Sequence, residues 1–364
     1  AWYRPLEQWM EETKAFDEAL GYGGRRLYTA QSGWFYDKAP AEITKPDFIY
    51  FHRSAYGPFD GGTIRGEKGW RGGDYTPSLE GAVRPVVCHE LGQWCAYPDY
   101  SIIDKMTGYL QPGNFRVYRE SAREKGLLPL AEEMKRCSGE NQLRLYKEDL
   151  EANFRTPEIG GFELLDLHDY LGQGTALVGI LDAFWEQKGY GSPEAFREHN
   201  GDTVLLLRCP SYVLQSSQSY TWEVLVSHFG KEPLTDQKIT WKLTVEDRKG
   251  CLAKEQETKK AAEIETYKDS NLQEKESFLD GRKAEKNGKS GKEQEKVLCQ
   301  GTLYAREISC GKNTELGSIC PDLSGVSAHT MATLHLQMGE VMNHWTFTIF
   351  ADKKVQETAP CLYT

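Results

Sequence analysis

Residues 84–92 read Arg84-Pro85-Val86-Val87-Cys88-His89-Glu90-Leu91-Gly92. In this stretch a short apolar run follows a proline and ends in a histidine, a glutamate and a glycine. Such a run is typical of a buried strand that opens into a polar loop at its carboxyl end. We therefore predict a strand over 85–88, with His89 and Glu90 where the loop begins.

Three other apolar runs have the same form, each followed by polar or aromatic residues. They cover 26–30, 48–51 and 162–165. The spacing of apolar residues predicts helices over 5–20, 114–120, 127–137 and 146–153. Short apolar strands that alternate with helices indicate parallel βαβ units. Four such strands are half of the eight that close a (β/α)₈ TIM barrel, so residues 1–200 are predicted to be the second half of such a barrel, strands five to eight.

The pattern changes near residue 200, where strand-like runs continue without helices between them. Runs at 203–207, 212–214, 221–226, 240–245, 303–308, 330–336 and 345–351 predict a β-sandwich over 201–364. The fold class is therefore α/β followed by all-β. Residues 253–296 carry 11 basic and 11 acidic side chains in 44 positions. A segment with so few large apolar residues is expected to be a disordered insertion between two strands.

Composition excludes several classes of protein. With 364 residues and 39% hydrophobic side chains, the chain has material for two packed domains. No apolar run reaches the 18 residues of a membrane-spanning helix. The net charge of −10 disfavours nucleic acid and anionic lipid as partners. The nine cysteines contain no CxxC pair, so no metal site is predicted and the disulfide pairing stays open.

Catalytic side chains of parallel barrels lie where strands end and loops begin. Here that rule collects one aromatic ring, three imidazoles and three carboxylates: Trp34, His52, His89, Glu90, Asp166, His168 and Asp169. Glycoside hydrolysis needs carboxylates and no cofactor, and this inventory fits it. Alternation of side chains places Asp166 and His168 on one face of their strand. Trp94 and Trp185 are expected to pack helices onto the barrel.

Two stretches carry a resemblance to a known family. Residues 84–92 resemble the seventh barrel strand of glycoside hydrolase family 2, which includes β-galactosidases, β-glucuronidases and β-mannosidases. Residues 160–169, beginning Gly160-Gly161-Phe162, resemble its eighth strand, and residues 343–350 are similar to the last strand of its C-terminal β domain. The resemblance implies a retaining exo-β-glycosidase with Glu90 as nucleophile. It implies that the other six residues bind a carbohydrate substrate, and that the protein is periplasmic or secreted.

The resemblance also implies a missing part. In that family the acid/base glutamate ends strand four as an Asn-Glu pair, and no such pair occurs near the start of this chain. We therefore expect strands one to four and the acid/base to be supplied by upstream sequence or by another chain. Two alternatives use other chemistry: a non-catalytic carbohydrate-binding protein on the same scaffold, and an acyl esterase. The esterase is disfavoured because no GxSxG motif occurs.

Overall fold

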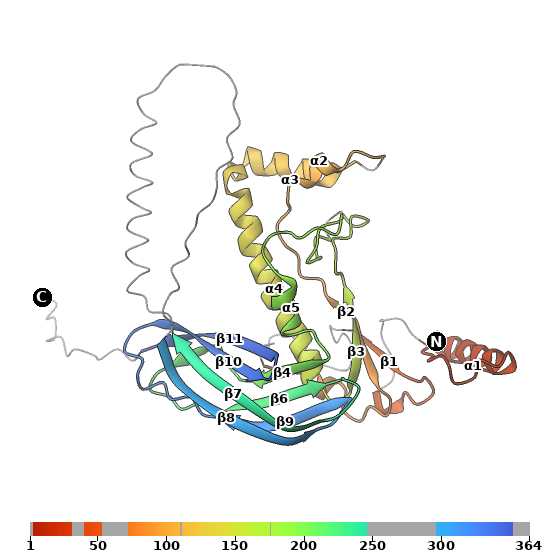
Figure 1. The fold of residues 1–364 in the computed structure, drawn as a ribbon. Helices are drawn as coiled ribbons and strands as arrows, with labels where there is room; N and C mark the ends of the chain where they lie inside the picture. Colours follow the sequence, from red (N-terminus) through yellow and green to blue (C-terminus); the bar gives the residue numbers. More distant parts are fainter. Residues whose placement is uncertain are drawn as a thin grey trace, which may run out of the picture.

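A computed structural model describes residues 3–30, 40–52, 72–109, 111–174, 176–245 and 296–351. Trp34 and residues 253–295 of the predicted insertion lie outside these ranges. The first half holds α1 (Tyr3–Ala19), β1 (Ile49–His52), β2 (Val86–Gly92), α2 (Ile102–Lys105), α3 (Gly113–Glu124), α4 (Ala131–Arg155), β3 (Ile159–Leu165) and α5 (Pro193–Arg197) (Figure 1). Within the described ranges, no helix has the length and apolar character needed to cross a membrane.

Strands β1, β2 and β3 form a parallel sheet in that order. Cys88 and Leu91 of β2 are buried against Leu150 of α4, with Phe162 of β3 packed beside them. The helix therefore covers one face of the sheet, and alternate side chains point to the opposite face. Three parallel strands do not close a barrel, so the partial barrel stays a prediction.

The structure corrects two local predictions in this half. Residues 26–30 form no strand. The backbone of Tyr28 bonds to one residue instead of to a neighbouring strand: its N–H donates to the carboxylate of Asp47, and its carbonyl accepts from the Asp47 N–H. Residues 131–137 of the helix predicted at 127–137 and all of the helix predicted at 146–153 belong to one long helix, α4, which follows a short 3-10 turn at Leu128–Leu130. Gly139 does not interrupt it. A side chain there would collide with the ring of Tyr190, so the glycine permits close packing.

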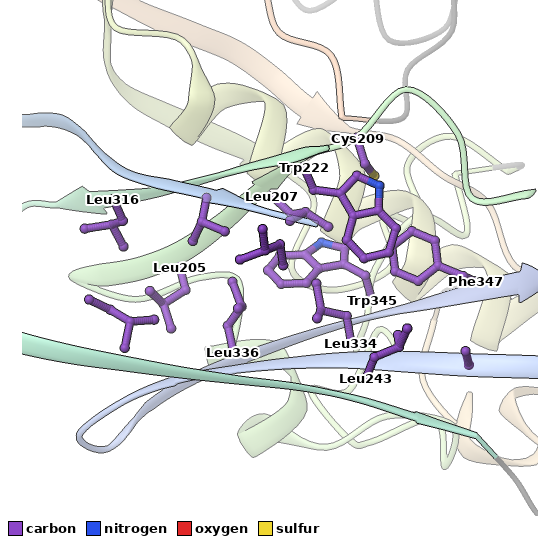
Figure 2. Close-up of a cluster of buried hydrophobic side chains, with 14 of the residues drawn as sticks. Leu205, Leu207, Cys209, Trp222, Leu243, Leu316, Leu334, Leu336, Trp345 and Phe347 are labelled. Carbon is purple, nitrogen blue, oxygen red and sulfur yellow. The ribbon is translucent and has the colours of Figure 1, made fainter. Parts of the chain in front are cut away.

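The second half holds β4 (Thr203–Arg208), β5 (Val213–Gln215), β6 (Trp222–His228), β7 (Leu234–Val245), β8 (Lys296–Ile308), β9 (Lys312–Ile319), β10 (Thr330–Met338) and β11 (Val341–Phe350). They form a five-stranded sheet, β5-β11-β10-β7-β8, and a three-stranded sheet, β4-β6-β9. Both sheets contribute to one hydrophobic core, in which Trp222 stacks on Phe347 with ring centroids 4.5 Å apart (Figure 2). Two sheets that share one core fit the predicted β-sandwich, and the sandwich fold class stays a prediction.

Candidate active site at the carboxyl edge of the parallel sheet

The register of the parallel strands brings the ends of β1, β2 and β3 to one edge. His52 pairs with His89, and Gly92 pairs with Leu165, so Asp166 follows directly beyond. The Gln93 N–H also donates to the Leu165 carbonyl at 2.9 Å. Because parallel strands share one direction, the polar residues that follow them gather at this edge.

Glu90 lies within β2, in an irregularity of the strand. Cys88 pairs with Phe162 and Leu91 with Leu164, so His89 and Glu90 together oppose the single residue Glu163. This two-against-one arrangement is a β-bulge, which re-aims side chains and is frequent next to active sites. The predicted strand is thus longer than 85–88, and the bulge replaces the simple strand end that the sequence indicated.

The backbone at Glu90 is strained. Its φ is +54°, and φ at Gln93 is +61°, a region that residues with a Cβ seldom occupy. The Gln93 side-chain amide donates to Glu90 Oε2 at 3.1 Å. Gly92, between them, has φ of +98° and lies against Tyr146, whose ring leaves no room for a Cβ. Strain of this kind persists where the surrounding structure enforces it, and it concentrates at functional sites.

His89 belongs to a polar cluster on the sheet face opposite α4. Its ring meets that of Tyr50 edge to face at 5.2 Å, and its Nε2 lies 4.0 Å from Glu163 Oε2. The Tyr50 hydroxyl donates to Glu163 Oε1 at 2.5 Å. This hydrogen bond to Glu163, together with burial, raises the pKa of Tyr50 to about 12. The three strands therefore each contribute one member of a cluster: Tyr50, His89 and Glu163.

Sequence reasoning missed Tyr50, Glu163 and Gln93. It considered only the residues that follow the apolar runs, whereas Tyr50 and Glu163 lie within them. A usable signal was present, because Glu163 stands between Phe162 and Leu164 and alternation places it on the other face of the strand. Gln93 carried no such signal, since its role depends on the bulge.

The acidic residues after β3 have different environments. Asp166 is half-buried, and its Oδ1 accepts from the N–H of Leu167 at 2.6 Å. Strand β3 ends at Leu165, so the alternation expected to align Asp166 with His168 does not extend to them. His168 instead forms an isolated bridge with Leu181, and its ring lies beside Trp185.

Asp169 is buried rather than presented to solvent. Its Oδ1 accepts from Lys188 Nζ at 2.6 Å and from the Gly179 N–H at 3.0 Å. Burial raises the pKa of Asp169 and lowers the pKa of Lys188, and each charge partly offsets the effect on the other. The pair holds the loop after β3 together. A sugar contact at Asp169 would have to compete with this internal partner.

The two remaining predicted residues are His52 and Trp34. The backbone of His52 ends β1, while its side chain lies outside what the structure describes, as does all of Trp34. Trp94 packs as expected and donates to Asp149 Oδ2 at 2.7 Å. In the described part of the chain, no group of three or more His, Cys, Asp or Glu side chains is placed to hold a metal ion.

Comparison with known proteins gives one family-model match over part of the chain and structural similarities of low TM-score. A domain of unknown function, DUF8488, matches residues 289–351. No curated protein sequence matches the chain. The solved structure of exo-chitosanase CsxA from Amycolatopsis orientalis is similar over 65% of this chain and 22% of its own, with 12% identity and a TM-score of 0.33.

Two further solved structures are similar at the same low level. One is the complex of a CsxA variant with PNP-β-D-glucosamine, similar over 61% of this chain and 20% of its own, with 11% identity and a TM-score of 0.32. The other is the sporulation control protein Spo0M from Bacillus subtilis, over 42% and 50%, with 10% identity and a TM-score of 0.24. The chain spans about a fifth of the exo-chitosanase.

Proposed function

We propose that this sheet edge is the nucleophile side of a retaining β-glycosidase site, with Glu90 as the nucleophile. The observation that carries the proposal is the placement of Glu90: a carboxylate in a strained bulge, at the carboxyl edge of a parallel sheet, with its orientation fixed by the Gln93 amide. A nucleophile must meet the anomeric carbon in one geometry, and a rigid bulge supplies that geometry.

In a retaining mechanism the Glu90 carboxylate forms a covalent bond to the anomeric carbon as the leaving group departs with a proton from a second carboxyl. Water then cleaves the glycosyl ester. His89 and Asp166 lie at the same edge and are proposed to contact sugar hydroxyls. Tyr50 and Glu163 contact the His89 ring and orient it. Because Glu163 already accepts a hydrogen bond from the Tyr50 hydroxyl and lies beside His89, we do not assign it as the acid/base, which is proposed to come from outside β1–β3.

The test is to trap the glycosyl-enzyme in the full-length protein. Dinitrophenyl 2-deoxy-2-fluoro-β-glycosides of the gluco, galacto and manno series form esters that hydrolyse slowly. Peptide mass spectrometry should find the label on Glu90, and Glu90→Gln should abolish labelling. Exposed Glu80 is a matched control, and Glu80→Gln should keep it. A label on another carboxylate, or turnover above about a tenth of wild type in Glu90→Gln, would refute the assignment.

A non-catalytic carbohydrate-binding protein is the second candidate. The observation that favours it is the engagement of Glu163, the carboxylate opposite the bulge, with Tyr50 and His89. A protein of this class would bind oligosaccharides while no fluoroglycoside of the series labels Glu90. The two candidates therefore separate in one experiment. Export to the periplasm or cell surface stays a prediction for both.

A further inference from the structure

The turn at residues 182–186, in the loop between β3 and α5, exposes two large aromatic rings. Trp185 is 60% exposed and Phe184 is 42% exposed, although the sequence predicted that Trp185 would pack against a helix. That prediction is wrong. Rings of this size are normally buried, and an exposed group of them marks a binding surface more often than a single exposed leucine does.

The same turn is strained and firmly held. Trp185 has φ of +65°, a conformation that bulky residues avoid unless other contacts enforce it. The buried carboxylate of Asp182 supplies those contacts: its Oδ1 accepts from the N–H groups of Phe184 and Glu186 at 2.8 and 2.9 Å. The Trp185 N–H donates to the Asp182 carbonyl at 3.0 Å.

A lysine from another segment, Lys105, also holds this turn. Lys105, at the end of α2, reaches Asp182 at 2.8 Å and Glu186 at 2.6 Å, and its ammonium lies 5.8 Å from the centre of the Phe184 ring. The turn is therefore fixed from both sides before any ligand arrives. A pre-organised ring loses little conformational freedom on binding, which favours affinity.

The rings belong to the same edge of the sheet as Glu90. The centroid of the Trp185 ring lies 4.5 Å from that of His168, and His168 is the third residue after β3. Figure 1 shows the chain between β3 and α5 beyond the ends of the parallel strands. Of the four non-glycine residues with positive φ in the described ranges, Glu90 lies in β2, Gln93 directly follows β2, and Trp185 lies in the loop between β3 and α5.

We propose that Trp185, with Phe184 and His168 beside it, is a stacking platform for a pyranose ring of the oligosaccharide. This inference rests on the carbohydrate-directed function proposed above. An exposed indole offers a flat apolar face to the C–H face of a sugar. Two carboxylates of the same loop, Glu186 next to Trp185 in sequence and Asp166 directly after β3, can accept hydrogen bonds from hydroxyl groups and repel the phosphates of nucleic acid. The platform adds a sugar contact that Glu90 chemistry does not require.

Binding is measured apart from turnover, so that failure of the platform and failure of the proposed reaction give different results. Isothermal titration with cellohexaose and with chitohexaose uses full-length protein carrying Glu90→Gln. Adding Trp185→Ala should weaken the binding of at least one hexasaccharide about tenfold or more, while Trp185→Phe keeps part of the affinity. Trp9 on α1 is also 60% exposed, so Trp9→Ala is the matched control and should bind as the parent does.

Equal affinities of Trp185→Ala and Trp9→Ala overturn the platform, and so does a parent protein that binds neither hexasaccharide. Fluoroglycoside labelling of Glu90 stands or falls independently of both results. Near-ultraviolet circular dichroism and the unfolding midpoint of each variant show whether its fold is intact. If Trp185→Ala unfolds the chain, Trp185→Gly, which suits a positive φ, replaces it in the comparison.

Discussion

Asn343 in β11 donates a hydrogen bond of 2.8 Å to Glu151 in α4, across 192 residues of sequence. The Glu151 carboxylate is fully buried and also accepts from three other donors: Lys147 at 2.5 Å, Arg155 at 3.3 Å and Trp345 at 2.9 Å. Burial by itself would raise its pKa, but the charges of Lys147 and Arg155 outweigh burial and lower it. This network joins the helix that covers the parallel sheet to the core of the second half.

Glu151→Gln should destabilise the protein strongly. The substitution leaves the charges of Lys147 and Arg155 in a buried site without their counterion, which typically costs about 3–5 kcal/mol. Urea unfolding followed by circular dichroism measures the loss. Glu140 is the matched control on the same helix, because it pairs with Arg136 at the surface. Glu140→Gln should change the unfolding free energy by less than about 0.5 kcal/mol, and similar losses for both variants would refute the role of the network.

Glu90→Gly should stabilise the fold while it removes the proposed nucleophile. Glycine adopts φ of +54° without the steric cost that a side chain imposes, and that cost is about 1 kcal/mol or more. Glu90→Val should lower stability, since a branched side chain suits this conformation least. Thermal unfolding of the two variants and wild type gives the order. If Gly is the least stable of the three, the strain at Glu90 is not real.

His199 predicts how stability depends on pH. Burial lowers the pKa of His199 to about 3, against about 6.5 for an unfolded chain. Between these values the unfolded state binds more protons, so stability is full above about pH 6.5 and falls as the pH is lowered toward 3. His199→Phe should flatten this part of the profile, measured by urea unfolding at several pH values. His329 is exposed, and His329→Gln should keep the wild-type slope.

Lys188→Met tests whether the buried Lys188–Asp169 ion pair holds the loop after β3 in place. Lys188 and Asp169 are both about 6% exposed, so removing the lysine leaves a buried carboxylate unpaired at a cost of about 3 kcal/mol or more. Adding Asp169→Asn, which can still accept from the Gly179 N–H, should recover part of the loss. Unfolding free energies of the two single variants and the double variant give the coupling. Lys231 is exposed, so Lys231→Met is the control. Additive effects of the Lys188 and Asp169 substitutions would contradict the stabilising role of this ion pair.

The sequence predicted the elements whose signals are local. Apolar runs located β1, β2 and β3, and periodicity located α1 and α3. The seven strand-like runs after residue 200 correspond to β4–β8, β10 and β11, whereas β9 was not predicted. The rule that polar residues at the ends of parallel strands meet at one edge also predicted that His52, Glu90 and Asp166 would lie near one another, as their register shows. These inferences needed only the spacing of residues along the chain.

Tertiary contacts determined the rest. The strand predicted at 26–30 does not form, and the backbone of Tyr28 hydrogen-bonds to Asp47 instead. One helix continues through Gly139, and the missing side chain there leaves room for the Tyr190 ring. The sequence predicted that Asp169 binds sugar, but its carboxylate accepts a hydrogen bond from Lys188, 19 residues away.

By itself, the sequence therefore determined where most strands and helices form and which carboxylate lies near the carboxyl end of the central strand, because hydrophobic periodicity is a local property. Only the tertiary structure decided the bulge that sets the backbone of Glu90, the pairing of Glu163 with Tyr50, and the exposure of Trp185. Each of these depends on which distant residue faces which, and an intrinsic preference at one position does not encode that choice.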